Sequence, residues 1–241
     1  MCLFSRYSKM SKFLLNVEGI IGAGKSTLIK DIVHNGVAAG SSVLTEPVDK
    51  FEVYEQYNPL ALFYQNPKEN VVPFQMHIIR TLNMVTSEHL TNAANTDHIN
   101  ISERGLYSPL VFIETLYKRQ ILNGFACCFL SKETSDLAID TMDKCNATYG
   151  GIFFIDTPIE ECIRRIRHRS RKSEEGGINF DYLNLLRMQY LNHLDYWRGK
   201  LGVDRVRVVN SLNRHTVLSE FRAFKEEMDN KIIQTLNQDS V

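Results

Sequence analysis

Residues 19–26 are Gly19-Ile20-Ile21-Gly22-Ala23-Gly24-Lys25-Ser26, which fit the pattern G-x-x-x-x-G-K-[ST] at every fixed position. An apolar run at 13–18 precedes this stretch, and a helical pattern at 26–34 follows it. A strand, a glycine-rich turn and a helix together present backbone N–H groups and a positive helix end to phosphate. The alternative is a glycine-rich turn with a chance lysine, but pattern and setting together favour nucleotide binding.

The residues of this loop have separate expected roles. Lys25 should contact the outer phosphates, and Ser26 should help to hold Mg²⁺. The sequence lacks N-K-x-D, and it lacks a run of four apolar residues followed by Asp-Glu. Both absences favour a phosphotransferase with a small substrate. The residues expected to bind the nucleotide here are Gly19, Gly22, Ala23, Gly24, Lys25, Ser26 and Thr27.

Strand and helix patterns alternate along the chain, which predicts a mainly parallel sheet covered by helices on both faces. We expect an N-terminal extension at 1–12 and one domain at 13–241. The predicted strands are 13–18, 42–45, 99–102, 151–155 and 206–209. The predicted helices are 26–34, 58–65, 71–95, 108–119, 131–147, 159–169, 181–198 and 215–236.

Composition excludes several classes of protein. The 241 residues carry 28 Lys+Arg and 28 Asp+Glu, and this zero net charge argues against a general nucleic-acid partner. No apolar run approaches the length of a membrane span. The five cysteines show no zinc-site spacing, which favours free thiols in the cytoplasm. The alternative compartment is the mitochondrion, because Arg6, Lys9 and Lys12 occur near the N-terminus without an acid.

Three charged residues follow predicted strands. Glu46 follows 42–45, and Glu103 and Arg104 follow 99–102. Ligands of open α/β sheets bind beyond the carboxyl ends of the strands, so these side chains should lie beside the phosphate loop. There a carboxylate can accept a proton or ligate Mg²⁺, and an arginine can neutralise phosphoryl charge. The alternative roles for the two acids are helix caps or surface ion pairs.

The stretch 163–172 is the most basic part of the chain, and Gly176-Gly177 follows it. A solvated helix face or a nucleic-acid patch is the ordinary explanation for such a run. Phosphoryl transfer offers a third, because an arginine-rich helix end before a glycine hinge can close over ATP and exclude water. We expect this lid at about 165–178.

These motifs occur in an order that resembles the deoxyribonucleoside kinase family, which includes deoxycytidine, deoxyguanosine and mitochondrial-type thymidine kinases. The order is the phosphate loop, Thr45-Glu46-Pro47-Val48, Phe74-Gln75, Glu103-Arg104 before Tyr107-Ser108, and the arginine-rich stretch. The resemblance covers about 13–210. It implies a P-loop kinase of three layers, with a five-stranded parallel sheet, an arginine-rich lid and a homodimer formed through helices.

The resemblance implies catalytic and sugar-binding roles. Glu46 matches the base that takes the proton from the sugar 5′-hydroxyl, and Arg104 matches the arginine beside that hydroxyl and the phosphates. Lys25 completes the catalytic set, and Glu103 joins Ser26 at Mg²⁺. Two further residues match those that recognise the 3′-hydroxyl, namely Tyr64 and Glu175.

The resemblance also implies how the base is bound. Gln75 matches the amide that hydrogen-bonds the base edge, while Phe74 and Phe51 should pack against the base. The apolar Leu82 and Pro109 stand where charged residues favour cytosine in other members, and Ile78 also lines the expected pocket, so thymidine, or pyrimidines more broadly, is the expected substrate. The lid arginines that match are Arg165, Arg169 and Arg171.

Two other functions stay open at this point. A thymidylate kinase shares the phosphate loop, a lid and an acid–arginine pair, but it has no need of Glu46 as a base. An inactive, kinase-like nucleotide-binding subunit is the second alternative, because the placement of catalytic groups cannot be inferred from residue types.

Overall fold

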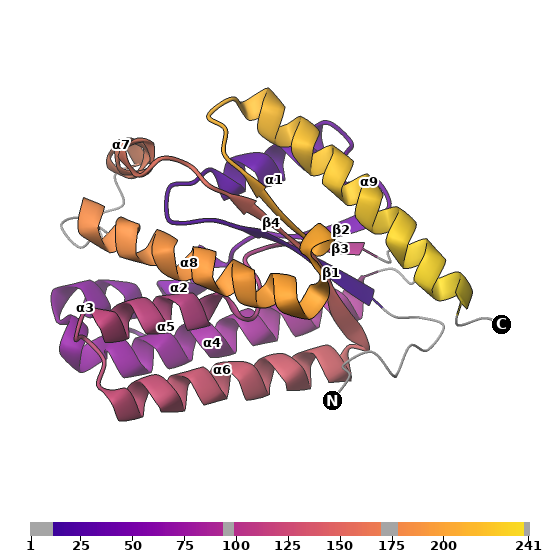
Figure 1. Cartoon of the computed structure of the whole chain (residues 1–241). Coiled ribbons are helices and arrows are strands. Elements are labelled where there is room, and N and C mark those ends of the chain that lie inside the picture. Colours follow the sequence, from indigo (N-terminus) through magenta and orange to yellow (C-terminus); the bar gives the residue numbers. More distant parts are fainter. Residues whose placement is uncertain (1–11, 94–98, 170–177, 239–241) are drawn as a thin grey trace.

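A computed structural model describes residues 12–93, 99–169 and 178–238 of the chain. Most of the expected N-terminal extension and lid therefore lies outside the described residues, as do the predicted site residues Arg171 and Glu175. Within the described part, the expected α/β architecture is confirmed. Two helical layers enclose one sheet (Figure 1).

The five strands are all parallel in the order β2-β3-β1-β4-β5. β1 lies at the centre, between β3 and β4, and its residues Phe13 to Glu18 are buried. Such continuous burial is typical of a strand whose two faces are both covered. The strands are β1 (Lys12–Glu18), β2 (Ser41–Leu44), β3 (Ile99–Glu103), β4 (Ala147–Ile155) and β5 (Val206–Val209).

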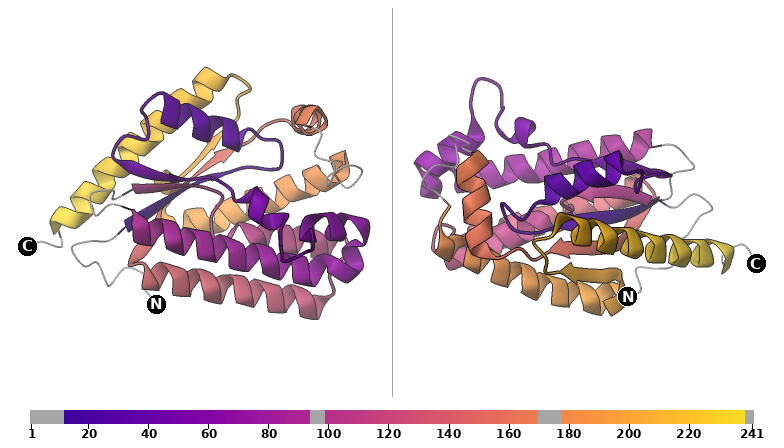
Figure 2. Two further views of the ribbon diagram at one scale, coloured as in Figure 1. Left: turned by 180° about the vertical axis from the view of Figure 1, so that it is seen from behind. Right: turned by 90° about the horizontal axis from the view of Figure 1, so that it is seen from above.

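The helices fall into two groups on opposite sides of the sheet (Figures 1 and 2). One side carries α1 (Lys25–His34) and α9 (Arg214–Gln238), and these two helices pack on each other. The opposite side carries α4 (Pro67–Asn92), α5 (Ser108–Lys118), α6 (Gly124–Lys144) and α8 (Phe180–Leu201). The remaining helices are α2 (Val48–Phe51), α3 (Pro59–Gln65), α7 (Ile159–Arg169) and the 3₁₀ turn η2 (Val203–Arg205).

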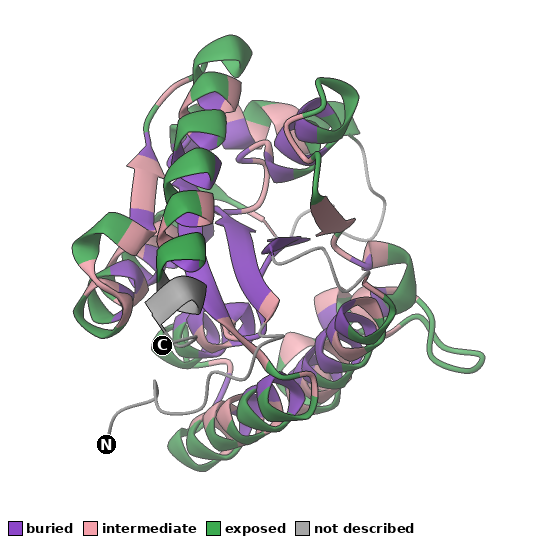
Figure 3. Ribbon diagram, turned by 90° about the vertical axis from the view of Figure 1, so that its right-hand side faces the viewer, coloured by how far each residue is buried: buried purple, intermediate pink, exposed green. Residues whose placement is uncertain are grey.

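Burial follows these layers. The inner strands β1, β3 and most of β4 are buried, as are the helix faces turned towards them, whereas the edge strands β2 and β5 are partly exposed and the outer faces of the helices are exposed (Figure 3). Among the described residues, no helix combines the length and the apolar character needed to cross a membrane.

The prediction was wrong around α6 and β4. The helix begins at Gly124 rather than 131, because the Asn123 side chain accepts a 2.8 Å hydrogen bond from the backbone of Ala126 and caps it. It ends before Asn146, whose left-handed φ of 49° turns the chain into β4. β4 then begins four residues earlier than 151, since the register with β1 shifts at Gly150 and a glycine there obscured the strand pattern.

Smaller differences concern the segment that leads to α4. The short helix α2 was not expected. α4 begins at Pro67 and not at 71, because proline suits the first turn of a helix, where its missing N–H has no partner to lose. This segment sets the position of the cavity wall opposite the phosphate loop.

Candidate nucleotide and nucleoside site

The phosphate loop joins β1 to α1 with the geometry that the sequence predicts. Gly22 and Gly24 have left-handed φ values of 83° and 102°. A Cβ atom at Gly22 would lie 2.7 Å from the carbonyl oxygen of Cys162, so α7 leaves no room for a side chain there. The loop thus needs glycine both for its backbone conformation and for its contact with α7.

Lys25 lies inside this loop. Its Nζ donates to the carbonyl oxygens of Gly19, at 3.2 Å, and Ile20, at 3.1 Å. Burial, with help from the charge of Arg104, lowers the pKa of Lys25 to about 8. A buried ammonium that donates to backbone carbonyl oxygens is well placed to exchange them for phosphate oxygens.

Ser26 and Glu103 form an oxygen-rich pair beside the loop. Ser26 Oγ donates a 2.6 Å hydrogen bond to Glu103 Oε1, and the backbone N–H of Glu46 approaches Glu103 Oε2 at 3.4 Å. A hydroxyl and a carboxylate are donors that Mg²⁺ accepts, with water and phosphate oxygens completing its coordination. The pair therefore fits a Mg²⁺ ion.

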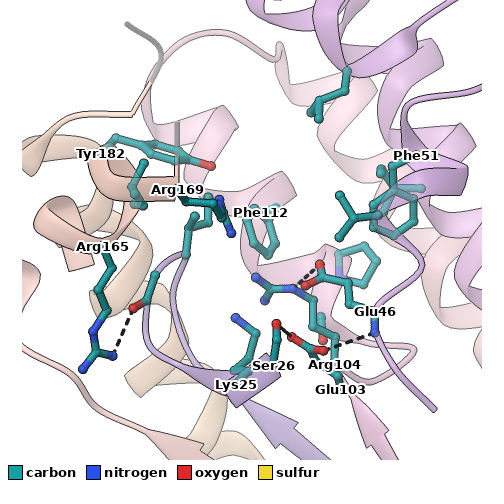
Figure 4. Close-up of a pocket in the computed structure, with 18 of the residues that line it drawn as sticks. Lys25, Ser26, Glu46, Phe51, Glu103, Arg104, Phe112, Arg165, Arg169 and Tyr182 are labelled. Carbon is teal, nitrogen blue, oxygen red and sulfur yellow. Dashed lines mark hydrogen bonds and ion pairs between the residues drawn. The ribbon is translucent and has the colours of Figure 1, made fainter. Parts of the chain in front are cut away.

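Arg104 and Glu46 lie directly next to this pair (Figure 4). Arg104 Nε donates to Glu46 Oε1 at 2.6 Å, and its guanidinium lies 4.9 Å from the centre of the Phe112 ring. Burial alone would lower the pKa of Arg104, but the charge of Glu46 and the neighbouring groups outweigh it, and the pKa is raised. Arg104 therefore stays positively charged and keeps a carboxylate in place at the cavity floor.

These groups open into a cavity of about 680 Å³ that reaches from the loop to α3 and α4. The volume is in the range of small-molecule sites. The predicted residues that line it are Gly22, Gly24, Lys25, Ser26, Thr27, Glu46, Phe51, Tyr64, Phe74, Gln75, Ile78, Leu82, Glu103, Arg104, Pro109, Arg165 and Arg169.

Gly19 and Ala23 do not line the cavity, although both were predicted to bind the nucleotide. The carbonyl oxygen of Gly19 faces Lys25, and that of Ala23 accepts hydrogen bonds from Thr157 Oγ1 at 2.8 Å and Arg165 Nη1 at 3.0 Å. Their contribution in this structure is to hold the loop.

The end of the cavity away from the loop is mostly apolar. Phe63 and Phe74 stack there with ring centres 4.8 Å apart. Gln75 is only 4% exposed, and its Oε1 has no hydrogen-bond partner among the described residues. A buried amide oxygen without a partner costs free energy, and a ligand that supplies a donor can recover it.

The arginines of α7 lie on the opposite side, across the phosphate loop. Arg165 Nε donates to Glu161 Oε1 at 2.7 Å, while its Nη1 reaches the carbonyl oxygen of Ala23. Arg169, at the end of α7, faces the cavity together with Tyr182 of α8 (Figure 4). The first part of the predicted lid is therefore ordinary helix that ends over the phosphate loop.

Sequence reasoning missed three aromatic residues of this cavity, namely Phe63, Phe112 and Tyr182. Phe112 stands three residues after Pro109 on α5, and this helical spacing could have identified it. Tyr182 follows the lid and carries the Arg119 guanidinium 5.1 Å from its ring centre. Nothing in the sequence around Tyr182 separates it from an ordinary core tyrosine.

Comparisons with known proteins agree with this geometry. The family model described as deoxynucleoside kinase matches residues 15–239. Thymidine kinase of Ictalurid herpesvirus 1 (strain Auburn) is 32% identical over 175 residues, which are 72% of this chain and 71% of that protein. Mitochondrial thymidine kinase 2 of Homo sapiens is 28% identical over 179 residues, 74% of this chain and 63% of that protein.

A solved structure shares the fold. Deoxyadenosine kinase from M. mycoides with bound dCTP has a TM-score of 0.68 and 18% identity, covering 89% of this chain and 100% of that one. The family match includes the phosphate loop, the strand-end acids and the helices around the cavity. The chain therefore belongs to the deoxynucleoside kinase family, and it is a nucleoside-phosphorylating enzyme.

Proposed function

We propose that this protein transfers the γ-phosphoryl group of ATP to the 5′-hydroxyl of a deoxyribonucleoside, with thymidine or other pyrimidine nucleosides preferred. The observation that carries the proposal is the position of Glu46. Its carboxylate lies in one cavity between the phosphate loop and the apolar end that contains Gln75. A base at that place meets a hydroxyl acceptor on one side and a phosphate donor on the other.

Each polar group then has a role in the reaction. Glu46 accepts the proton of the 5′-hydroxyl, and Arg104 orients Glu46 and neutralises charge on the transferring group. Lys25 holds the outer phosphates. Ser26 and Glu103 hold Mg²⁺, which would neutralise charge on the phosphates when bound. Arg165 and Arg169, with Arg171 beyond the described residues, belong to a lid at about 165–178 that excludes water.

The nucleoside occupies the apolar end. Gln75 hydrogen-bonds the edge of the base, because its buried Oε1 is without a partner in the described structure. Phe51 and Phe74 pack on the base, and Tyr64 with Glu175 binds the 3′-hydroxyl. The apolar lining by Ile78, Leu82 and Pro109 supports thymidine, as does the similarity to thymidine kinases.

The test measures ADP release with Mg-ATP and, separately, thymidine, deoxycytidine, deoxyguanosine and thymidine monophosphate. Turnover with thymidine above the other acceptors supports the proposal. A strong preference for deoxycytidine or deoxyguanosine contradicts the choice of base. Turnover with thymidine monophosphate alone would identify a thymidylate kinase. ATP binding without turnover of any acceptor would identify an inactive subunit.

Cellular role, compartment and assembly are part of the same proposal. A kinase of free nucleosides serves nucleotide salvage and so supplies DNA precursors. We place the enzyme in the cytoplasm, with the mitochondrion as the alternative. Localisation of the tagged full chain distinguishes the two compartments.

We propose a homodimer through α4 and α6, which size-exclusion chromatography with light scattering tests. Exposed apolar residues that support it are Met84, Phe125, Phe129 and Ile139.

A further inference from the structure

Arg104 is held from behind by a buried tyrosine. Its Nη1 donates to the hydroxyl oxygen of Tyr190 at 2.6 Å, and that hydroxyl donates in turn to Glu18 Oε2 at 3.2 Å. Tyr190 on α8 is 1% exposed, and Glu18 at the end of β1 is 6% exposed. Neither residue lines the large cavity, so neither can touch a substrate there.

Glu18 also fixes the chain that follows Arg104. Its Oε1 accepts hydrogen bonds from the backbone N–H of Gly105, at 2.7 Å, and from the hydroxyl of Ser108. Every one of these partners donates to the carboxylate, as the partners of an ionised acid do, and they oppose the burial that raises the pKa of Glu18. One side chain thus holds the turn after β3 and, through Tyr190, the guanidinium itself.

The backbone of Arg104 needs such support. Its φ of 67° is left-handed, a conformation that side chains other than glycine seldom adopt. Strained residues persist only where the surroundings determine their position, and they concentrate at functional sites. The Nε of Arg104 points to Glu46 in the cavity, whereas Nη1 is held by Tyr190. The orientation of Arg104 towards the reacting groups is therefore set on the side away from the cavity.

We infer that Glu18 and Tyr190 are a positioning pair: they hold Arg104, and through it Glu46, in the geometry of phosphoryl transfer. The inference rests on the proposed roles of Arg104 and Glu46. The pair contributes to kcat rather than to substrate affinity, since it touches no bound molecule.

The test replaces Tyr190 with phenylalanine. Tyr190→Phe keeps the ring packed against Phe154, 5.3 Å away between ring centres, and removes only the hydroxyl. The control is Tyr149→Phe, because Tyr149 is also buried, at 8% exposed against 1% for Tyr190, and its hydroxyl takes no part in the hydrogen bonds that hold Arg104. The two variants therefore delete the same atom from a buried position, and Tyr190→Phe alone of the two removes a hydrogen bond to Arg104.

We expect Tyr190→Phe to lower kcat about tenfold, the size of effect of one lost hydrogen bond to a charged group. KM for nucleoside and for ATP should stay within about twofold, and Tyr149→Phe should keep the parent kcat. An unchanged kcat in Tyr190→Phe overturns the inference. A raised KM with parent kcat also overturns it, because it would indicate a role in binding.

A second measurement is independent of turnover. In protein labelled with ¹⁵N-arginine, the Arg104 Nε–H signal, assigned with Arg104→Lys, should be sharp in the parent and in Tyr149→Phe. It should broaden in Tyr190→Phe, as the guanidinium gains freedom. If the parent protein showed no kinase activity, the proposed function would be refuted, but the Arg104 Nε–H signal could still be compared between the variants. If that signal is identical in all three proteins, the positioning role is overturned.

Glu18→Gln completes the set. The glutamine NH₂ group cannot accept a hydrogen bond from the Tyr190 hydroxyl, and the neutral amide also removes the ion pair in which Glu18 Oε2 lies 4.0 Å from Arg104 Nη1, so Arg104 loses the support that reaches it through Tyr190 together with this charge. Two residues that act through one hydrogen-bonded network should have non-additive effects on kcat. The kcat of the double variant should therefore equal that of the slower single variant within about twofold. If the loss of kcat in the double variant equalled the product of the two single losses, Glu18 and Tyr190 would act independently, which contradicts the inference.

Discussion

The Nε of Arg104 lies 2.6 Å from Oε1 of Glu46, and this contact joins the ends of two neighbouring strands across 58 residues of sequence. It gives the carboxylate a fixed direction at the floor of the cavity. In the proposed reaction this arrangement makes Glu46 a preorganised general base, because the cost of orienting the carboxylate is met when the protein folds.

Glu46→Gln tests that function. The amide keeps the shape of the side chain and can still accept from Arg104, but it cannot take up a proton from the 5′-hydroxyl. We expect kcat to fall by roughly 10²- to 10⁴-fold. Nucleoside binding, measured by calorimetry, should change little. Glu69→Gln, at an exposed position of α4, is the control and should retain parent activity. A Glu46→Gln variant that keeps half of the parent kcat would show that Glu46 is not the general base.

Gly22→Ala tests the contact between the phosphate loop and α7. The left-handed φ of 83° alone costs an alanine about 1–2 kcal/mol, and the clash 2.7 Å from the carbonyl oxygen of Cys162 adds to that. We expect weaker ATP binding and a lower midpoint of thermal unfolding.

Gly36→Ala is the matched control for this prediction. Gly36 has a similar φ of 66°, but no atom lies within 4 Å of a Cβ placed there. Its variant should show only the backbone cost and bind ATP as the parent does. If both alanine variants lose equal stability and both keep ATP affinity, the contact with α7 is unimportant.

The phosphate loop and the strand-end acids could be predicted because their signals are local. Eight consecutive residues define the loop, and a parallel sheet brings the ends of its strands to one edge whatever their distance along the chain. Glu46 and Glu103 therefore needed only a correct assignment of strands. Phe112 could also have been predicted, because it stands three residues after Pro109 on the same helix.

The network behind Arg104 could not be predicted in this way. Glu18 and Tyr190 stand 172 residues apart, and each resembles an ordinary residue of a buried strand or helix. The early start of α6 was hidden for a different reason. Phe125 is 83% exposed, so the first turn shows no regular alternation of apolar and polar faces, and only the Asn123 cap marks it.

Gln75→Leu separates recognition of the base from stability. It deletes a buried oxygen that has no partner among the described residues, so the free energy of unfolding should stay equal or rise. The value of kcat/KM for the nucleoside should fall by about 10- to 100-fold, as expected for one lost hydrogen bond in a closed site. KM for ATP should not change. A variant that loses stability but keeps the nucleoside kcat/KM would mark Gln75 as a structural residue.

The pKa of His193 predicts how the free energy of unfolding depends on pH. His193 is half-buried on α8, and its Nε2 accepts a 2.8 Å hydrogen bond from Trp197 Nε1, so the neutral ring is required. Burial lowers the pKa of His193 to about 4, against about 6.5 in the unfolded chain. Above pH 6.5 the ring is neutral in both states. Between pH 6.5 and 4 the unfolded state takes up a proton that the folded state does not, and this favours unfolding.

The expected loss from this one residue is at most about 3 kcal/mol across that interval. Urea unfolding of the parent, His193→Gln and the exposed His34→Gln at pH 7.5 and 4.5 measures it. The difference between the two pH values is the relevant quantity, because any constant cost of the substitution cancels. It should shrink in His193→Gln, whose amide can still accept from Trp197, and stay at the parent value in His34→Gln. Equal differences in all three proteins would mean that a neutral His193 does not contribute to the acid sensitivity of the fold.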